Sequence, residues 1–289
     1  MKRTISVLAL VSAVAVLLAA EPLTLAAVWV GGMCLAFVTG RGEQILLTAI
    51  IMSAALVAVH TLLFVWALCR EWRRSAALRR WLMPVRASPW PGNLASAAAQ
   101  LGLSGRLDLI ESPEVNAFCY GLINPRICIT TGMVRRLNRG QLSAVLLHER
   151  QHARQFDPLR LAVAHGFRTS LFYIRLVPVI AQRYAERREL QADDAAVLHL
   201  GSTRPLAAAL VRVLLQPEPA AAQYSGAAIS GFSAAAARVD RLMNETRELD
   251  PLLGRREFSE LFLSAGALAI VVLAGAYSVT AVLASHLCA

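Results

Sequence analysis

Long apolar runs stand near both ends of this chain, and shorter periodic segments fill its middle. Four runs without Asp, Glu, Lys or Arg are expected to be membrane helices: residues 4–20, 23–39, 45–69 and 261–287. The third run is long enough to span a bilayer, which takes about 20 apolar residues in a helix. The first run follows Lys2 and Arg3, so it also fits a signal peptide. Because a second run follows almost at once, we favour a tight hairpin of two short spans.

Residues 93–258 carry the patterns of a folded domain with both helices and strands. Alternation of polar and apolar residues predicts three short strands, at 106–110, 115–120 and 126–130. We expect them to form a small sheet, for which an antiparallel arrangement is one option. Apolar residues at helical spacing, with Pro, Asn or Gly at the ends, predict helices over 93–103, 132–137, 138–157, 181–200, 205–216 and 235–247. A basic helix over 75–86 is expected to lie along the membrane.

Residues 159–180 are apolar but are interrupted by Arg160, His165, Arg168 and Arg175. Charges at this density argue against a lipid-exposed span. One or two helices, packed against the domain or lying at the membrane interface, fit better, with a short membrane-embedded hairpin as the alternative. The loop over 217–231 is rich in Ala, Gly, Pro and Ser.

Composition and charge support a membrane protein. The chain is 56% hydrophobic, which is high for a soluble domain. We divide it into N-terminal transmembrane segments (1–69), a basic juxtamembrane linker (70–92), a folded domain (93–258) and a C-terminal transmembrane helix (261–287). The fold class is therefore mainly α, with multi-pass membrane helices and one α+β domain.

Arginines predict the orientation in the membrane. Nine of them flank the third and fourth spans on the side of the folded domain: Arg70, Arg73, Arg74, Arg79, Arg80, Arg86, Arg247, Arg255 and Arg256. By the positive-inside rule, the folded domain is cytoplasmic and the protein lies in the cell membrane. The net charge of +10 suits an anionic lipid leaflet. We expect no direct nucleic-acid binding, because no aromatic interleaving or binding motif accompanies the arginines.

The candidate chemistry lies in a His-Glu-x-x-His stretch. His148 and His152 are four residues apart, so they lie on one face of the predicted helix over 138–157. Both imidazoles can then bind one Zn²⁺, and Glu149 can act as the base that polarises a water molecule. The alternative is a solvated helix with two unrelated histidines. Arg150 favours that alternative, because the position is usually uncharged in zinc peptidases.

A second stretch makes the metal site more specific. A catalytic zinc site needs three protein ligands and one open position. Glu189 can supply the third ligand from a separate helix, and Asp193 lies on the same face four residues on. Asp193 can then accept the second N–H of a ligating histidine and fix its orientation. The alternative is a charged helix face on which these acids pair with Arg187 and Arg188.

Further residues are candidates for binding substrate or the transition state. Arg238 and Arg241 are either solvated, or one of them reaches Asp193 or a substrate carboxylate. Together with Tyr224 they are candidate oxyanion donors, and Asn116 is a candidate substrate contact. The five cysteines form no zinc or redox pattern, and we expect buried thiols. His165 is expected to be structural, because it is too far along the chain to join the histidine pair by helical spacing.

Several motifs occur together in the order of a known family. They are Asn116-Ala117-Phe118-Cys119-Tyr120-Gly121, Pro125-Arg126-Ile127, Gly132-Met133, the run over 142–158, Glu189 to Asp193, and Arg238 to Leu242. In these motifs the chain resembles the BlaR1-type membrane metallopeptidases (family M56), which are related to the M48 peptidases that include HtpX and Ste24. The run Asp157-Pro158-Leu159-Arg160 favours the BlaR1 side. The resemblance implies a zincin-like metallopeptidase domain in which His148, His152 and Glu189 bind Zn²⁺ and Glu149 is the catalytic base.

The implied activity is a zinc-dependent metalloendopeptidase, with regulatory proteolysis on the cytoplasmic side as the expected role. A BlaI-like repressor is the substrate by analogy only. No β-lactam sensor is expected, because the only lysine is Lys2 and the sensor needs a Ser-x-x-Lys motif. Two alternatives stay open: a non-catalytic, metal-stabilised signalling receptor or scaffold, and an HtpX-like quality-control protease of the membrane. A structural site would be closed by a fourth ligand, and Cys119 is the residue that could approach.

Overall fold

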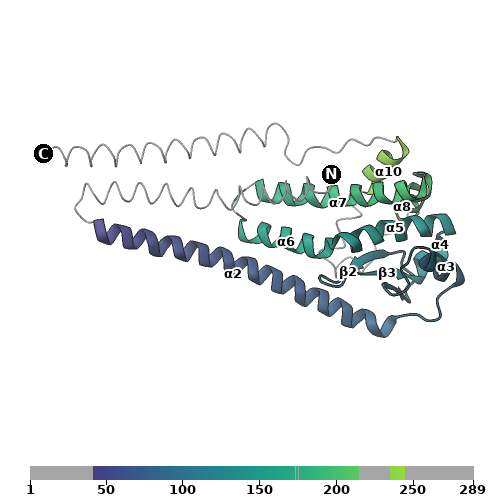
Figure 1. Ribbon diagram of the computed structural model, residues 1–289, viewed down its shortest axis with the longest axis horizontal. Helices are drawn as coiled ribbons and strands as arrows, with labels where there is room; N and C mark the ends of the chain where they lie inside the picture. Colours follow the sequence, from purple (N-terminus) through teal and green to yellow (C-terminus); the bar gives the residue numbers. More distant parts are fainter. Residues whose placement is uncertain (1–41, 173, 175, 215–234, 245–289) are drawn as a thin grey trace. The chain divides into compact units, whose positions relative to one another are not determined.

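The computed structural model describes residues 42–172, 174, 176–214 and 235–244 (Figure 1). The predicted spans 4–20, 23–39 and 261–287 and the predicted loop 217–231 lie outside these residues. The predicted span 45–69 falls inside helix α2 (Gly42–Leu82). Within the described residues, no helix has both the length and the hydropathy that crossing a membrane requires. The membrane spans therefore stay predictions.

Helix α2 continues without a break to Leu82, so the separate basic helix predicted over 75–86 is wrong. A short 3-10 turn, η1 (Met83–Val85), follows, and Pro84 within it cannot extend the helix. The described residues from Leu62 onward belong to one compact unit. Leu82 is 1% exposed and packs with Ile110, Tyr120 and Cys128 of the sheet. The end of α2 thus covers one face of the sheet.

The sheet has three strands, β1 (Leu107–Ile110), β2 (Ala117–Tyr120) and β3 (Arg126–Thr130), in the spatial order β1-β3-β2. The strands lie close to their predicted positions, but the arrangement is mixed. Strand β2 pairs antiparallel with β3, whereas β1 pairs parallel with it. The outer edge of β1 is covered because Ala87 N donates to Leu109 O and Glu111 N donates to Val85 O. Strand β2 is left as the unpaired edge among the described strands.

A buried acid ties the three strands together. Asp108 on β1 accepts hydrogen bonds from the Tyr120 hydroxyl of β2 at 2.6 Å and from Arg126 of β3 at 2.6 and 2.8 Å. Arg86 pairs with the same carboxylate at 3.1 Å. Burial raises the pKa of Asp108, but the hydrogen bonds from Arg126 and Tyr120 and the nearby charges hold it below its ordinary value. A charged group in the interior therefore has the partners that it needs.

Helix α5 (Arg139–Gln155) is the central element, and Figure 1 shows it between the sheet and α7. It begins with a capping box: the Asn138 side chain accepts from Gln141 N, and the Gln141 side chain accepts from Asn138 N. Leu142 and Leu146, predicted to face the interior, are fully buried against β1 and β3. Ala144 and Leu147 on the other side pack with residues of α7, α8 and α10. Both faces of α5 are therefore buried.

Six further described helices complete the unit. They are α3 (Gly92–Gln100), α4 (Thr131–Arg136), α6 (Asp157–Ser170), α7 (Leu176–Leu200), α8 (Arg204–Leu214) and α10 (Ala235–Met243). Several predicted boundaries differ from the observed ones. The metal helix was expected to end at Asp157-Pro158, but α5 ends at Gln155 and Asp157 begins α6. Helix α7 begins at Leu176 rather than 181, so the segment 159–180 divides between α6 and α7.

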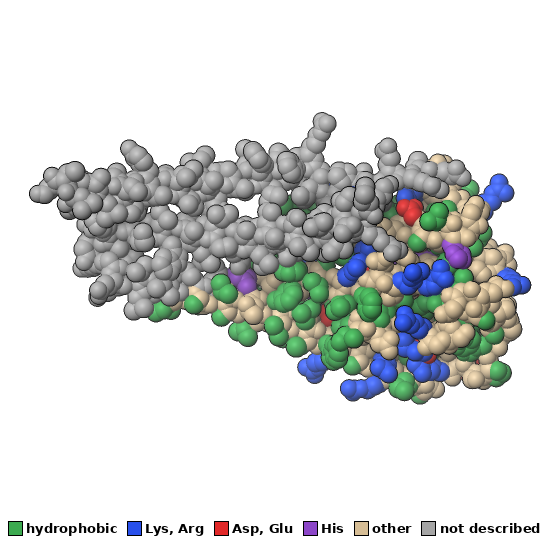
Figure 2. Space-filling model, in the orientation of Figure 1, with side chains coloured by type: hydrophobic (Ala, Val, Ile, Leu, Met, Phe, Trp, Pro, Cys, Tyr) green, Lys and Arg blue, Asp and Glu red, His purple; other side chains and the backbone are tan. Residues whose placement is uncertain are grey.

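Four acidic side chains of this unit lie in its interior. Asp108, Glu149, Asp157 and Asp193 are all buried. On the face drawn in Figure 2, blue basic side chains are numerous and red acidic ones are few. Basic side chains therefore predominate over acidic ones on the face that Figure 2 shows.

Candidate metal centre

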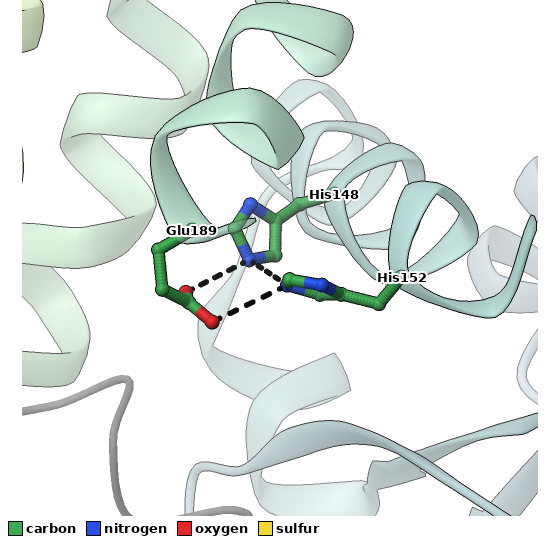
Figure 3. A group of neighbouring side chains, drawn as sticks. All are labelled: His148, His152 and Glu189. Carbon is green, nitrogen blue, oxygen red and sulfur yellow. Dashed lines mark hydrogen bonds and ion pairs between the residues drawn. The ribbon is translucent and has the colours of Figure 1, made fainter. Parts of the chain in front are cut away.

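Three predicted ligands meet at one point (Figure 3). His148 and His152 lie one turn apart on α5, and Glu189 reaches them from α7. The two Nε2 atoms are 3.0 Å apart, and the Glu189 carboxylate lies 3.4 Å from His148 Nε2 and 3.5 Å from His152 Nε2. All the donor atoms of this group lie within 4.8 Å of one another. His148 and His152 are buried and Glu189 is partly exposed, so solvent can reach the group from the side of Glu189.

This donor set fits a zinc ion. Two imidazole nitrogens and one carboxylate oxygen form a ligand set found in catalytic zinc sites, which keep a fourth position open. Tetrahedral ligands about 2.0–2.1 Å from zinc stand about 3.3 Å from one another. The two Nε2 atoms, 3.0 Å apart, are close to that spacing, and the carboxylate lies 3.4 Å from Nε2 of His148 through Oε2 and 3.5 Å from Nε2 of His152 through Oε1. Among the described residues, the group contains no cysteine, so Cys119 does not close the site.

Each histidine is held from behind by a carboxylate. Nδ1 of His148 lies 2.9 Å from Oδ1 of Asp193, the contact expected from the sequence. Nδ1 of His152 lies 2.7 Å from Oδ2 of Asp157, a residue that the sequence analysis did not assign to the site. A carboxylate on Nδ1 fixes the ring and leaves Nε2 to face a metal. Both rings are thus oriented for binding through Nε2.

Two buried arginines complete these contacts. Arg238 of α10 donates to both oxygens of Asp193, at 2.8 and 2.6 Å, and to Oε2 of Glu189 at 2.9 Å. Arg188 of α7 pairs with Oδ1 of Asp157 at 2.5 Å. From the sequence, Arg188 is expected only as a candidate partner of the acids on its own helix face. In the structure its ion pair is with Asp157, the acid that contacts His152. Each histidine therefore stands at the head of a His–Asp–Arg chain.

These contacts shift the pKa of the ligands in the metal-free protein. Burial lowers the pKa of His148, but hydrogen bonds to Asp193 and Glu189 raise it to about 10 overall. Burial raises the pKa of Glu189, yet the hydrogen bond with His148 and the charges of His148, His152 and Arg238 hold it far below its ordinary value. Without a metal, the site therefore holds a proton on His148 that a metal ion would replace.

Glu149 lies beside the ligands on α5 and is 7% exposed. Burial raises the pKa of its carboxyl, and the charge of Glu189 adds to this, while those of His148, His152 and Arg238 oppose it. A raised pKa suits a carboxylate that must take up a proton and release it again. Its role as the catalytic base stays a prediction.

The residues predicted to bind substrate or the transition state have different positions in the structure. Arg241 pairs with Asp194 at 3.0 Å. The backbone of Asn116 forms two hydrogen bonds with Thr130. Asn116 N donates to the hydroxyl of Thr130, and Thr130 N donates to Asn116 O. Tyr224 lies outside the described residues. Among the proposed substrate-binding residues that the structure describes, Arg238 contacts the centre, through Asp193 and Glu189.

Three residues that raised questions in the sequence have local explanations. Arg150, the charged residue between the two histidines, does not simply face solvent. It is half-buried and donates to Leu101 O at the end of α3, away from the histidine rings. His165 on α6 contacts Arg70 of α2 at 2.6 Å, in keeping with a structural role. Cys119 is a free thiol whose pKa is raised, mainly by burial, with Glu149 and Asp157 adding to the shift.

Comparison with known proteins places this centre in a family. The family described as peptidase family M48 matches residues 92–286. The chain is 30% identical over 96 residues to a protease HtpX homolog of Nitrosomonas europaea, covering 32% of this chain and 32% of the relative. It is 30% identical over 137 residues to a protease HtpX homolog of Acidiphilium cryptum, covering 46% and 47%. A protease HtpX of Haemophilus influenzae is 31% identical over 88 residues, covering 30% and 31%.

The chain belongs to peptidase family M48. The matches span about a third to a half of the length of these relatives. The motifs of the sequence resemble the BlaR1-type peptidases of family M56, but the family that matches is the related family M48. Membership of family M56 is therefore not confirmed. The motifs that carried the resemblance fall within the matched residues.

Proposed function

We propose that this protein is a zinc-dependent endopeptidase of the cell membrane that hydrolyses peptide bonds of a protein substrate. One observation carries the proposal. Two Nε2 atoms and one carboxylate converge from α5 and α7, and each ring is fixed by its own buried acid. A solvated helix with unrelated histidines would not need Asp193 and Asp157 behind them.

The residues have distinct roles in this reaction. His148, His152 and Glu189 would hold zinc, which when bound supplies a Lewis acid that polarises the scissile carbonyl and acidifies water. Glu149 takes the proton of the attacking water and passes it to the leaving amine. Asp193 and Asp157 keep the rings in the orientation that presents Nε2. The partly exposed side of Glu189 is where substrate would enter.

A metal-stabilised receptor or scaffold is the competing function. Such a protein would need a closed site, with a fourth cysteine or histidine. The candidate group in the described part of the chain has three donors. Glu149 is a buried acid with a raised pKa next to His148, and a purely structural metal site does not need such a residue. Both points favour catalysis.

The location and role follow from the sequence and the relatives. The four apolar runs and the arginines beside them support a multi-pass protein whose catalytic domain faces the cytoplasm. Matches to proteins named protease HtpX favour an HtpX-like protease that acts on membrane proteins. Regulatory cleavage of a BlaI-like repressor uses the same chemistry and is supported by the motif resemblance alone.

The test compares wild type with Glu149→Gln in detergent-purified full-length protein. β-Casein serves as a general substrate, and cleavage of the chain itself is followed in parallel. We expect both proteins to bind zinc and cleavage to fall about 10²–10⁴-fold in the variant, the contribution typical of a general base. The matched control is Glu186→Gln, which removes the same charge from an exposed position on α7 bonded to Gln182.

The outcomes separate the two functions. Zinc binding with cleavage only in wild type and the Glu186→Gln control supports the peptidase. Zinc binding without cleavage in any protein supports the receptor. Wild-type activity in Glu149→Gln would remove this residue from the mechanism.

A further inference from the structure

Arg238 has an unusual position for a residue so far from the metal-binding stretches in sequence. It lies on α10, is 5% exposed, and donates hydrogen bonds to Asp193 and Glu189 of the metal centre. Its Nε and Nη2 donate to the two oxygens of Asp193, and its Nη1 donates to Oε2 of Glu189. Nη2 also lies 3.4 Å from Nδ1 of His148. One guanidinium therefore contacts an acid behind a histidine and a candidate ligand at once.

These contacts leave Arg238 badly placed to bind substrate. Its donors are directed at two carboxylates, and the side chain is enclosed. A substrate carboxylate or an oxyanion would have to displace Asp193 or Glu189 from it. Of the roles expected from the sequence, the contact with Asp193 is therefore favoured over a contact to substrate or transition state.

Arg241 provides a matched comparison within the same helix. Three residues after Arg238, it also links α10 to α7, through Asp194 at 3.0 Å. Asp194 is 45% exposed, whereas Asp193 is fully enclosed. Both arginines thus attach α10 to α7, but only Arg238 reaches the groups that contact the histidines.

We propose that Arg238 is a positioning residue for the metal centre. Its fork holds Asp193 in the orientation that accepts from His148 Nδ1, and it holds Glu189 through Oε2, the oxygen nearer His148. The other oxygen, Oε1, remains directed at His152. A planar fork is needed for this, because lysine offers a single point charge and cannot engage two carboxylates in the same way. The inference rests on the proposed metal site.

The charge of Arg238 and its hydrogen bonds predict opposite changes in metal affinity when Arg238 is replaced. A cation near a metal repels it, so removing Arg238 would strengthen metal binding if charge were its main effect. Removing it also leaves the enclosed Asp193 without two hydrogen bonds, at 2.6 and 2.8 Å. Breaking one side of a buried pair leaves an uncompensated charge, which is a large effect. We therefore expect geometry to dominate and metal binding to weaken.

The test is titration of metal-free, full-length protein with Co²⁺, read by visible absorption, followed by displacement with Zn²⁺. Arg238→Gln is expected to weaken Co²⁺ binding about 10–100-fold, as loss of contacts behind metal ligands commonly does, and to alter the cobalt spectrum. Arg238→Lys should recover only part of the affinity. Arg241→Gln, which also removes an α10–α7 ion pair, should bind Co²⁺ as wild type does. In the double variant with Asp193→Asn, the loss should be much smaller than the two single losses combined.

Each outcome has a definite meaning. If wild type binds neither Co²⁺ nor Zn²⁺, the proposed function and this inference fall together. If wild type binds metal and Arg238→Gln binds as well or more tightly, only the inference falls. Equal losses in Arg238→Gln and Arg241→Gln would mean that Arg238 merely holds α10 in place. If Arg238→Gln does not fold, Arg238→Lys decides. A Co²⁺ affinity and cobalt spectrum equal to those of wild type would show that the guanidinium fork is not needed.

Discussion

Nδ1 of His152 lies 2.7 Å from Oδ2 of Asp157, the first residue of the next helix. The contact depends on a turn at Phe156, which has a left-handed backbone with φ of 56°. This turn ends α5 and returns the chain so that Asp157 stands behind the ring at the end of α5. Arg188 pairs with the same acid, as Arg238 pairs with Asp193 behind His148. The two rings are therefore oriented by equivalent chains from different helices.

Asp157→Asn is expected to weaken zinc binding about 10–100-fold, because the amide has the size of the acid but lacks its charge. Competition with a chromogenic chelator measures the affinity. Asp194→Asn is the control, since it removes an acid of α7 that pairs with Arg241 rather than with a histidine. Equal affinity in Asp157→Asn and wild type would show that His152 does not need this acid.

The metal-free protein should lose stability as pH rises from about 7 towards 10. The pKa of His148 is raised from 6.5 to about 10 in the folded state. A raised pKa means that the folded state holds the proton more tightly, so the stabilisation is complete below the unfolded value of 6.5 and is lost through the folded value of about 10. Thermal unfolding of chelated protein across this range measures the effect.

The control for this pH effect is His148→Gln, which lacks the titrating ring. Its unfolding temperature should vary less between pH 7 and 10, and the difference from wild type isolates His148 from the other groups that titrate there. Parallel pH profiles in the two metal-free proteins would contradict the pKa assigned to this ring.

Gly132→Ala should destabilise the fold although alanine favours helices. A Cβ at this position would overlap two backbone atoms, the carbonyl oxygens of Pro113 and Glu114. Overpacking of this kind costs about 1–3 kcal/mol, more than the gain of about 1 kcal/mol expected from helix propensity. Chemical denaturation measures the change. Gly140→Ala, where the nearest atom is the Asn138 Oδ1 at 3.6 Å, should be neutral or stabilising.

Much of the domain could be predicted because its signals are local. Strand β3 has its predicted bounds, since alternation and the turn before it are both visible in sequence. The start of α5 is marked by Asn138, which forms the capping box. Leu142 and Leu146 are buried as the helical spacing predicts. The same spacing brings His148 and His152 together.

The errors concern contacts that local patterns do not determine. The parallel pairing of β1 with β3 depends on which strands meet in space, so strand signals alone could not distinguish it from an antiparallel sheet. The turn at Phe156 has no glycine to announce it, and for that reason Asp157 was taken as a helix end instead of a partner of His152. An acid five residues after the second histidine, just before Pro158, was the available signal. Arg238 and Arg241 were both candidates to reach Asp193, and the fold distinguishes them: Arg238 bonds Asp193, whereas Arg241 pairs with Asp194.

The most direct test of the account is metal removal and return. Detergent-purified wild-type protein is stripped with a chelator, assayed on β-casein, and then titrated with Zn²⁺ while bound metal is counted. The account predicts that cleavage disappears with the metal and returns in proportion to zinc, reaching its limit at one ion per chain. Cleavage that persists in metal-free protein, or zinc uptake unchanged when His148, His152 and Glu189 are all replaced by alanine, would contradict it.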